Sequence, residues 1–443
     1  MLSKAGAKAA RRISAAEAAA FVKSGDWLDY GVGFNQPDAF DHALAARAAE
    51  LRDVTIRNCL SMRPRAFLEA DPRGEHFRCF NWHFSGYDRR LHDAGRCQYI
   101  PCNLGEIPTY YRRFVERLDI AVIKTAPMDA EGYFNYGPLN LWHPAVVERA
   151  ATVIIEECAD IPPVHGPQVK LHRSQVDYVI PGDGAPIPEL PNAATTDVDR
   201  AVARLIAAEI EDGACLQVGI GGMPNAVTTL LLDSGVQDLG IHTEMLNDGL
   251  AELYRAGRVS GARKAFDQGR VTYSFALGSR ALYDTVRDNP DFVCRPVDET
   301  NLPDTIARND RVVAINNTTQ IDLQGQAASE SDGHRHISGT GGQLQFVRGA
   351  YASKGGKSFI CLASTYERRG VRKSRIVVDL TPGNIVTTPR SDMMYVVTEY
   401  GIANLKGKSV PERAMALIQL AHPDYRPELT REAREKGLIP PPR

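Results

Sequence analysis

Short apolar runs alternate with helical patterns along almost the whole chain. The runs are rich in Val and Ile and are only a few residues long, as is typical of buried strands, whereas the segments between them repeat apolar residues at helical spacing. This alternation predicts an α/β fold built on open sheets. The expected strands cover residues 54–57, 120–123, 153–155, 215–218, 312–315, 359–362, 375–378 and 394–397.

The pattern breaks between Pro181 and Val198. This segment is rich in Pro, Gly, Asp, Asn and Thr and has no periodicity, which indicates a linker. We therefore expect an N-terminal domain over residues 1–185 and a C-terminal domain over residues 196–443.

The two sides of the linker resemble each other faintly, which indicates duplicated halves. Three matches occur in the same order: 31–33 with 219–221, 53–56 with 238–241, and 129–132 with 322–325. In the register of the second match, Glu244 stands where the first half has Cys59, so the halves are expected to differ in chemistry. We predict two similar open-sheet α/β domains with the active site in the cleft between them.

Composition agrees with a folded protein of two domains. The chain has 443 residues, of which 43% are hydrophobic and 24% charged. The net charge of −2 provides no general attraction to nucleic acid or to an anionic membrane, so we expect neither as a partner. No apolar run is long enough to span a bilayer.

The N-terminal sequence and the cysteines bear on the compartment. The Ala-rich opening with Lys4, Lys8 and Arg12 resembles a transit peptide, but it runs directly into a helix-capping box at Ser14 to Glu17. The eight cysteines are scattered without a CxxC pair or a zinc spacing, which indicates reduced, mostly buried thiols. We predict a cytoplasmic protein without a metal site.

A glycine turn follows the expected strand at 215–218. Gly219-Ile220-Gly221-Gly222-Met223 leads into a helix through Pro224, so free backbone N–H groups and a helix N-terminus could hold a phosphate or an oxyanion. Tight-turn packing explains the same glycines equally well. The segment lacks the GKS/T of a P-loop and the spacing of GxGxxG, which argues against nucleotide hydrolysis and simple dinucleotide binding.

Glu244 lies in the segment 240–249, where we expect it at the end of a further short strand. A carboxylate there would lie at the ligand-binding edge of an open α/β sheet, although a solvated loop acid is the simpler interpretation. His242 is expected to pack or to form hydrogen bonds rather than to act as a base.

A second glycine cluster begins at Ser338 and is followed by Lys354 and Lys357. Two glycine loops, one of them trailed by lysines, fit a long ligand that carries a carbonyl and phosphates, although both lysines could be plain surface charges. His334 and His336 lack nearby carboxylates and cysteines at ligand spacing, so we interpret them as loop residues.

The first half holds a dense aromatic and polar segment at residues 81–111, which suits a pocket wall or a buried loop. Because the glycine turns and Glu244 belong to the second half, we expect the first half to complete the substrate pocket. The expected pocket residues are Met62, Arg63, Trp82, His83 and Tyr87. No G-x-S-x-G elbow is present, so a serine hydrolase has no candidate nucleophile.

Taken together, these segments resemble the acetyl-CoA hydrolase/transferase branch of class I CoA-transferases, which includes 4-hydroxybutyrate and butyryl-CoA:acetate CoA-transferases. The resemblance runs almost end to end. Its most specific segments are 219–227, 242–249, 314–326, 338–349 and 398–407.

The resemblance implies a ping-pong transfer of CoA from a short-chain acyl-CoA to a carboxylate such as acetate, butyrate or 4-hydroxybutyrate. It implies Glu244 as the nucleophile that forms an acyl anhydride and then a CoA thioester, Asn301 as the residue that orients it, and Glu399 as a second glutamate near it. The backbone amides around Ile220 and Gly342 would hold the oxyanion.

The resemblance also implies CoA contacts, a homodimer and no permanently bound cofactor, CoA being a substrate. The implied CoA-binding residues are Gly219, Ile220, Gly221, Gly222, Met223, Thr319, Gly341, Lys354 and Ser364. Around Thr319 the sequence Asn-Asn-Thr-Thr-Gln departs from the Asn-Ser-Ala-Leu-Glu that is common in relatives. An acyl-CoA hydrolase that uses the same glutamate and a non-catalytic CoA or sugar-phosphate binding protein are the alternatives.

Overall fold

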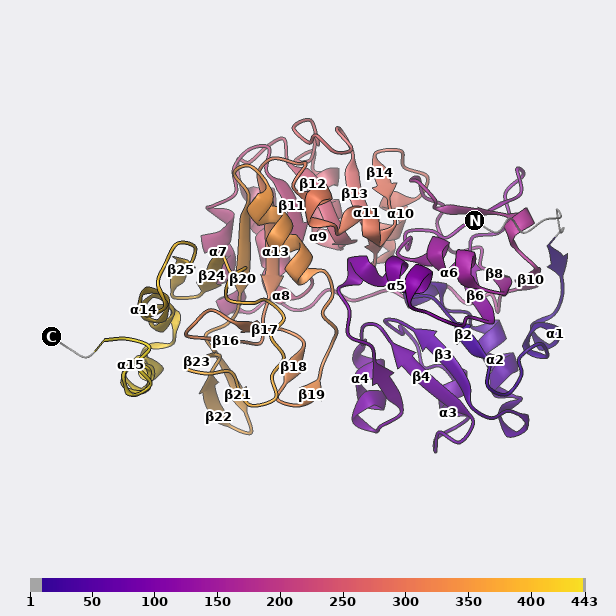
Figure 1. Cartoon of the computed structure of the whole chain (residues 1–443). Coiled ribbons are helices and arrows are strands. Elements are labelled where there is room, and N and C mark those ends of the chain that lie inside the picture. The colour runs from indigo at the N-terminus through magenta and orange to yellow at the C-terminus, as the bar shows by residue number, and fades with distance from the viewer. Residues whose placement is uncertain (1–9, 441–443) are drawn as a thin grey trace. The chain divides into compact units, whose positions relative to one another are not determined.

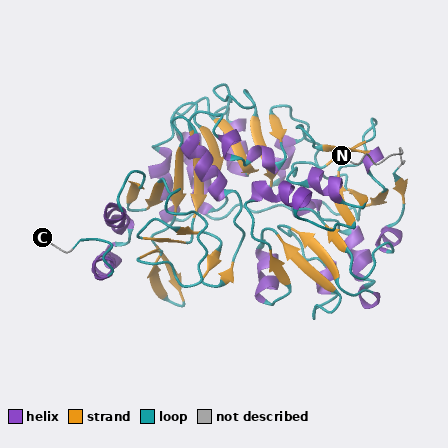
Figure 2. Cartoon of the chain, in the orientation of Figure 1, coloured by secondary structure: helices purple, strands orange, loops and turns teal. Residues whose placement is uncertain are grey.

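The computed structural model describes residues 10–440 and contains two main sheets with helices packed against their strands (Figures 1 and 2). Lys4 and Lys8 of the Ala-rich opening lie outside the described residues. The capping box at Ser14 and Glu17 is present and begins α1, as predicted.

The chain divides into two compact units. Unit 1 comprises the described residues up to Leu190 together with Ser274–Ala276 and Tyr283–Glu299, and unit 2 comprises the remainder. The break after Leu190 falls within the segment that we interpret as a linker, where residues 182–196 form no regular element. The sequence did not indicate the two short segments that join unit 1, and the domain bounds 1–185 and 196–443 stay a prediction.

The main sheet of unit 1 has the order β1-β10-β8-β6-β2-β3-β4-β5, and its neighbouring strands are parallel. Its strands are β1 (Arg11–Arg12), β2 (Trp27–Asp29), β3 (Val54–Asn58), β4 (Phe77–Asn81), β5 (Cys97–Tyr99), β6 (Ile120–Thr125), β8 (Thr152–Glu157) and β10 (Tyr178–Pro181). β7 (Tyr133–Asn135) and β9 (Lys170–His172) form a separate antiparallel pair. The helices of this half are α1 (Ala15–Ala19), α2 (Ala39–Ala45), α3 (Ala66–Glu69), α4 (Gly86–Asp93), α5 (Ile107–Arg113) and α6 (His143–Arg149).

The second main sheet has the order β14-β13-β12-β11-β15-β20-β24-β25. Its strands are β11 (Cys215–Val218), β12 (Gly240–Leu246), β13 (Val271–Ala276), β14 (Phe292–Cys294), β15 (Val312–Asn317), β20 (Lys357–Cys361), β24 (Tyr395–Thr398) and β25 (Gly401–Asn404). The helices are α7 (Asp197–Ala207), α8 (Gly222–Asp233), α9 (Asp248–Arg255), α10 (Arg280–Val286), α11 (Val297–Thr300), α12 (Pro303–Ile306), α13 (Gln343–Ala352), α14 (Val410–Leu420) and α15 (Arg426–Glu435).

The second half also contains small sheets beside its main sheet. They are built from β16 (Gln320–Asp322), β17 (Ala327–Ala328) and β23 (Ile376–Val377), from β18 (Ser331–Asp332) and β19 (Arg335–His336), and from β21 (Thr365–Arg368) and β22 (Val371–Ser374). Every predicted strand overlaps an observed one, and the 375–378 segment is reduced to β23. His336, which we interpreted as a loop residue, belongs to the hairpin strand β19. Strands such as β6 are buried along their whole length, as expected for parallel strands that are covered on both faces.

The two main sheets share one topology, which confirms the prediction of two similar α/β halves. β2, β3, β4 and β5 lie in spatial order, and β6, β8 and β10 continue on the other side of β2; β11 to β14 and then β15, β20 and β24 repeat this arrangement. In each sheet the chain first adds strands on one side of its first central strand and then adds the later strands on the other side. The strand order therefore reverses once in each sheet, beside β2 and beside β11. Ligands of open α/β sheets bind at such switch points, outside the carboxyl ends of the strands.

Matching turns in the two halves support the duplication at the level of single bonds. Asp129 Oδ1 accepts the N–H groups of Glu131 and Tyr133, and Asp322 Oδ1 accepts those of Gln324 and Gln326 in the same pattern. Gly132 and Gly325 close these turns at φ +88° and +93°, a conformation that favours glycine. Both halves therefore retain the same local geometry although their sequences have diverged.

Candidate active site

The predicted site residues of the second half gather at the carboxyl edge of its main sheet. The glycine turn at Gly219 follows β11, Glu244 lies in the carboxyl half of β12, Ser364 follows β20 and Glu399 follows β24. Parallel strands end at the same edge, so segments that are far apart in the sequence meet there. β12 runs two residues beyond Glu244, so this carboxylate lies within the strand rather than at its end.

Glu244 is the centre of this cluster. Its carboxylate accepts a short hydrogen bond from Asn301 Nδ2, and the side chain is only partly exposed. Burial raises the pKa of Glu244 from 4.5 to about 7, against the opposing effect of the Asn301 hydrogen bond. The carboxylate is thus poorly solvated and is partly ionised at neutral pH, which suits a nucleophile.

His242 holds the segment that carries Asn301. Its Nε2 lies 2.8 Å from the carbonyl oxygen of Thr300, and its ring packs near Phe266 and Phe346. The side chain is fully buried. His242 therefore has the packing and hydrogen-bonding role that we expected from the sequence.

The second glycine loop lies directly against Glu244. A methyl group added at Gly342 would overlap the carboxylate of Glu244 and the amide of Asn301. Gly342 is also the N-cap of α13, whose first N–H groups have no partner within the helix. The backbone of Gly342 therefore lies against Glu244, and only glycine allows this approach.

The first glycine turn presents its backbone outward. Ile220 is 57% exposed, Gly221 has φ +124°, and α8 begins at Gly222, two residues before Pro224. The side chain of Met223 is buried, so a CoA contact there would have to involve its backbone.

The remaining predicted residues of unit 2 differ in how they relate to this cluster. Ser364 and Glu399 lie together, because the Ser364 N–H and hydroxyl donate to the Glu399 carboxylate at 2.9 and 2.6 Å. In the part of the chain that the structure describes, no hydrogen bond joins Glu399 to Glu244. The Thr319 hydroxyl is used within the fold, where it donates to the carbonyl oxygen of Ala328 at 2.6 Å.

Lys354 lies away from the glycine turns. It follows the C-terminus of α13, a ten-residue helix that begins beside Glu244 and is about 15 Å long. The carbonyl of Lys354 accepts the N–H of Arg311, just before β15 begins, so Lys354 lies at the opposite edge of the sheet. Lys357 pairs with Glu209 at 2.8 Å.

The predicted pocket residues of the first half meet at the carboxyl edge of the sheet in unit 1. The segments that follow β3 and β4 run side by side, since the Leu60 N–H donates to the His83 carbonyl at 2.9 Å and the Arg65 N–H donates to the Tyr87 hydroxyl at 3.2 Å. Met62 is partly exposed. These residues therefore form one local group, as a shared pocket wall requires.

The side chains of Trp82, Arg63 and Tyr87 each form contacts within unit 1. Trp82 is buried and its indole N–H donates to the Tyr111 hydroxyl at 3.2 Å. Arg63 pairs with Asp38 at 2.7 Å rather than being solvated. Direct substrate contact is thus easier for Met62 and His83 than for Trp82, and the roles of all five residues stay a prediction.

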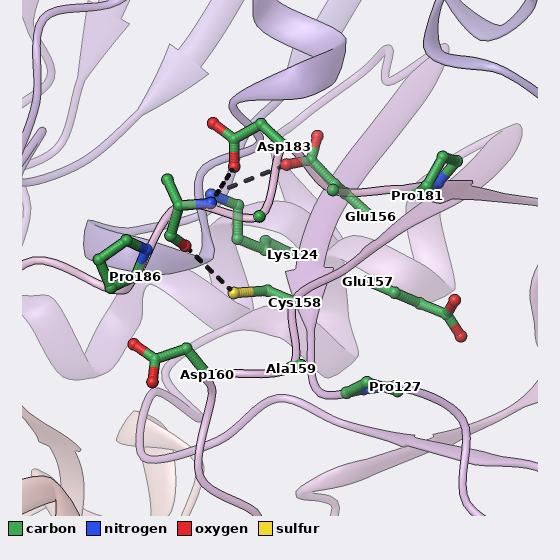
Figure 3. Close-up of a pocket in the computed structure, with 13 residues that line it drawn as sticks. Lys124, Pro127, Glu156, Glu157, Cys158, Ala159, Asp160, Pro181, Asp183 and Pro186 are labelled. Atoms are coloured by element: carbon green, nitrogen blue, oxygen red, sulfur yellow. Dashed lines mark hydrogen bonds and ion pairs between the residues drawn. The ribbon is translucent and has the colours of Figure 1, made fainter.

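A cavity of about 580 Å³ opens in unit 1 beyond the carboxyl ends of β6, β8 and β10 (Figure 3). Lys124 contributes its side chain and pairs with Glu156 at 3.7 Å and with Asp38. Glu157, Asp160 and Asp183 add further carboxylates, which engage Arg12, the Ile187 N–H and the Ala185 N–H respectively. None of the residues that we predicted as site residues lines this cavity.

Three residues at the edge of unit 2 were quoted in motifs but not named as site residues. Gln345 accepts from Asn301 Nδ2 at 3.4 Å, and Asn247 and Asn317 contact the first glycine turn. Nothing in the local sequence distinguishes these side chains from ordinary helix-capping or strand-end amides.

Over residues 10–440, no helix is long and apolar enough to cross a membrane. The same residues contain no group of three or more His, Cys, Asp or Glu side chains that could hold a metal ion. The eight cysteines are all buried and free, as predicted.

Comparisons with known proteins identify the family of this chain. The acetyl-CoA hydrolase/transferase N-terminal domain matches residues 7–191, and the corresponding C-terminal domain matches residues 278–433. The butyryl-CoA:acetate CoA-transferase of Anaerostipes caccae is 45% identical over 429 residues, which are 96% of each chain. The crystal structure of RipA from Yersinia pestis superimposes with a TM-score of 0.88 at 37% identity, covering 97% of this chain and 98% of that one.

A third match is the crystal structure of 4-hydroxybutyrate CoA-transferase from Porphyromonas gingivalis, with a TM-score of 0.78 at 33% identity and coverage of 96% and 98%. The duplicated α/β fold and these matches together define an enzyme of the CoA-transferase class. The chain belongs to the acetyl-CoA hydrolase/transferase family.

Proposed function

We propose that the enzyme moves CoA from a short-chain acyl-CoA to a small carboxylate such as acetate, through covalent intermediates on Glu244. Butyrate and 4-hydroxybutyrate are the acyl groups to test first, because the names of similar enzymes contain them. The observation that carries the proposal is the partly buried Glu244 carboxylate, held by Asn301 and covered by the backbone at Gly342.

The reaction proceeds by four exchanges at carbonyl carbon. The Glu244 carboxylate attacks the thioester and expels CoA thiolate, which leaves an acyl-glutamyl anhydride. The thiolate then attacks the glutamyl carbonyl, releases the first acid and forms a glutamyl-CoA thioester. The acceptor carboxylate attacks this thioester to form a new anhydride, and CoA thiolate attacks its acyl carbonyl to give the new acyl-CoA and free Glu244. Covalent catalysis thus divides one difficult exchange into easier steps and needs no ATP.

Each step passes through a tetrahedral oxyanion, for which backbone N–H groups near Ile220 and Gly342 are the donors. One such donor contributes about 10² to 10³ in rate. Asn301 orients the carboxylate through its hydrogen bond, and Glu399 with Ser364 completes the edge of the site. The glycine turn from Gly219 to Met223 and Gly341 then carry the CoA contacts.

The proposal also covers the cofactor, the oligomeric state and the compartment of the enzyme. CoA thioesters are substrates and no cofactor is permanently bound, since the chemistry requires only a carboxylate and backbone donors. A homodimer is proposed by analogy with the family. A cytoplasmic location agrees with eight buried, free cysteines.

The test begins with Glu244→Ala and Glu244→Gln, which we expect to abolish and nearly abolish exchange, because an amide is a very poor nucleophile toward a thioester. Wild type incubated with acyl-CoA and then borohydride should carry a reduced adduct at Glu244 in peptide mass spectra. Normal turnover by the alanine variant would show that Glu244 is not the nucleophile.

A panel of acyl-CoA donors against carboxylate acceptors, read by mass spectrometry of the CoA products, identifies the substrates. Free CoA that forms without an acceptor would indicate hydrolysis of the same glutamyl intermediate instead of transfer.

A further inference from the structure

Two asparagine side chains hold the turn that follows β11. Asn247 Nδ2 donates to the carbonyl oxygen of Gly219 at 3.3 Å, and Asn317 Nδ2 donates to the carbonyl oxygen of Ile220 at 3.2 Å. Two successive peptide groups of the turn are therefore each fixed through their oxygen atoms.

Fixing a carbonyl also fixes an N–H group. In a planar trans peptide the C=O and the following N–H point in opposite directions. The bond to Gly219 therefore directs the Ile220 N–H, and the bond to Ile220 directs the Gly221 N–H, away from the asparagines. Within residues 10–440, neither of these N–H groups has an acceptor in the protein. The turn thus presents two oriented and unused donors.

The asparagines come from the strands on either side of β11. Asn247 follows β12, three residues after Glu244, and its Oδ1 accepts the Leu250 N–H at 3.1 Å as the N-cap of α9. The strand that carries the nucleophile is thereby tied to the turn.

Asn317 is the last residue of β15, and its Oδ1 accepts the Cys361 thiol at 3.1 Å. A Cβ atom at Gly221 would lie 3.0 Å from Asn317 Nδ2, so this contact also accounts for a glycine there. The turn that follows β11 is therefore held by one asparagine from each of the two neighbouring strands, β12 and β15.

We propose that Asn247 and Asn317 are positioning residues that aim the N–H groups of Ile220 and Gly221 at the oxyanion formed when Glu244 reacts. The inference rests on the proposed function. It extends the site to two side chains that touch neither the nucleophile nor the reacting carbonyl.

The first pair of variants is Asn317→Leu and Asn317→Asp. Both lack the amide donor, and leucine adds no charge. We expect each to lower kcat by about 10²- to 10³-fold, the effect of one lost oxyanion donor, while the KM for acyl-CoA changes far less. The glutamyl-CoA thioester should still be trapped by borohydride, but more slowly.

The second pair is Asn247→Ser and Asn247→Asp. Both retain an oxygen that can cap α9 and lose only the Nδ2 donor, which lies 3.3 Å from the Gly219 carbonyl oxygen and 3.5 Å from that of Val218. A loss of kcat therefore cannot be assigned to the helix. The matched control is Asn404→Asp, because within residues 10–440 the Asn404 side chain accepts a hydrogen bond, from the Lys406 N–H at 3.0 Å, and donates none. Its kcat should equal that of wild type. Near-UV circular dichroism verifies that each variant is folded.

Unchanged kcat in Asn317→Leu and Asn247→Ser would overturn the inference. A loss confined to the aspartate variants would also overturn it, since charge and not the missing donor would then be responsible. A rise in KM without a change in kcat would show that the turn only binds CoA. None of these results affects the role of Glu244, which its own alanine variant tests separately.

Discussion

The raised pKa of Glu244 predicts that its ionised carboxylate destabilises the fold. Glu244→Gln removes the ionisable group and keeps an oxygen that can accept the hydrogen bond from Asn301. We therefore expect this variant to be nearly inactive and yet more stable than wild type at pH 8.

The size and sign of the effect follow from linkage. Below pH 4.5 the carboxyl group is protonated in both the folded and the unfolded chain, so wild type and variant differ little. Between pH 4.5 and about 7 the unfolded chain loses the proton while the folded chain keeps it, so the free energy of unfolding of wild type falls. The full change in pKa corresponds to roughly 3 kcal/mol. Because the side chain is partly exposed, we expect a gain of about 2 kcal/mol at pH 8.

Urea unfolding of wild type and Glu244→Gln, followed by fluorescence at intervals from pH 4.5 to 8.5, measures this difference. The difference in free energy of unfolding between Glu244→Gln and wild type should grow up to about pH 7 and then stay constant. Glu412→Gln is a control of opposite sign, because hydrogen bonds from Ser409 lower the pKa of Glu412. The free energy of unfolding of that variant should be lower than that of wild type at pH 8. The difference should disappear in acid, where Glu412 is protonated in both the folded and the unfolded chain. An advantage of Glu244→Gln that is absent, or that does not depend on pH, would refute the account of a poorly solvated nucleophile.

Three further outcomes are expected, two from the same site and one from the predicted pocket residues of the first half. The rate of CoA exchange should fall below pH 7 to about a tenth of its plateau at pH 6, as measured in a pH–rate profile, because only ionised Glu244 attacks. Gly342→Ala should lower kcat at least ~100-fold because its methyl group displaces the carboxylate, whereas Gly235→Ala, which meets open space, should match wild type in the same assay. Substitution of Trp82 or Met62 should alter the relative kcat/KM for acetate, butyrate, 4-hydroxybutyrate and a dicarboxylate more than it alters CoA affinity. Unaltered ratios would make these residues structural.

The placement of Lys354 shows how sequence proximity can mislead. Lys354 follows the second glycine cluster closely in the chain, which made a phosphate contact plausible. The intervening residues form α13, and a helix of that length carries its two ends to opposite edges of the sheet. Trp82 illustrates a second case, because a pocket wall and a hydrogen-bonded core residue have the same composition, and only the contact with Tyr111 separates them.

The sequence alone was enough to predict most of the secondary-structure elements and to propose one reactive group, Glu244. Strands, the linker and the duplicated turns are encoded locally, by apolar runs and by Gly, Pro and Asp at fixed spacing, so they could be predicted without knowledge of the fold. Glu244 was predicted as the nucleophile because its position matches the glutamate of the family that the sequence resembles, and this role stays a prediction.

The tertiary structure alone decided which side chains meet. Asn301 reaches Glu244, Asn317 reaches the turn at Ile220, and the sulfurs of Cys79 and Cys97 lie 3.1 Å apart on neighbouring strands. In a parallel sheet, adjacent strands are separated in the sequence by a helical crossover, so spacing along the chain does not record which residues become neighbours. The amides that fix the glycine turn look like ordinary strand-end and capping residues until the order β12-β11-β15 brings them to either side of it.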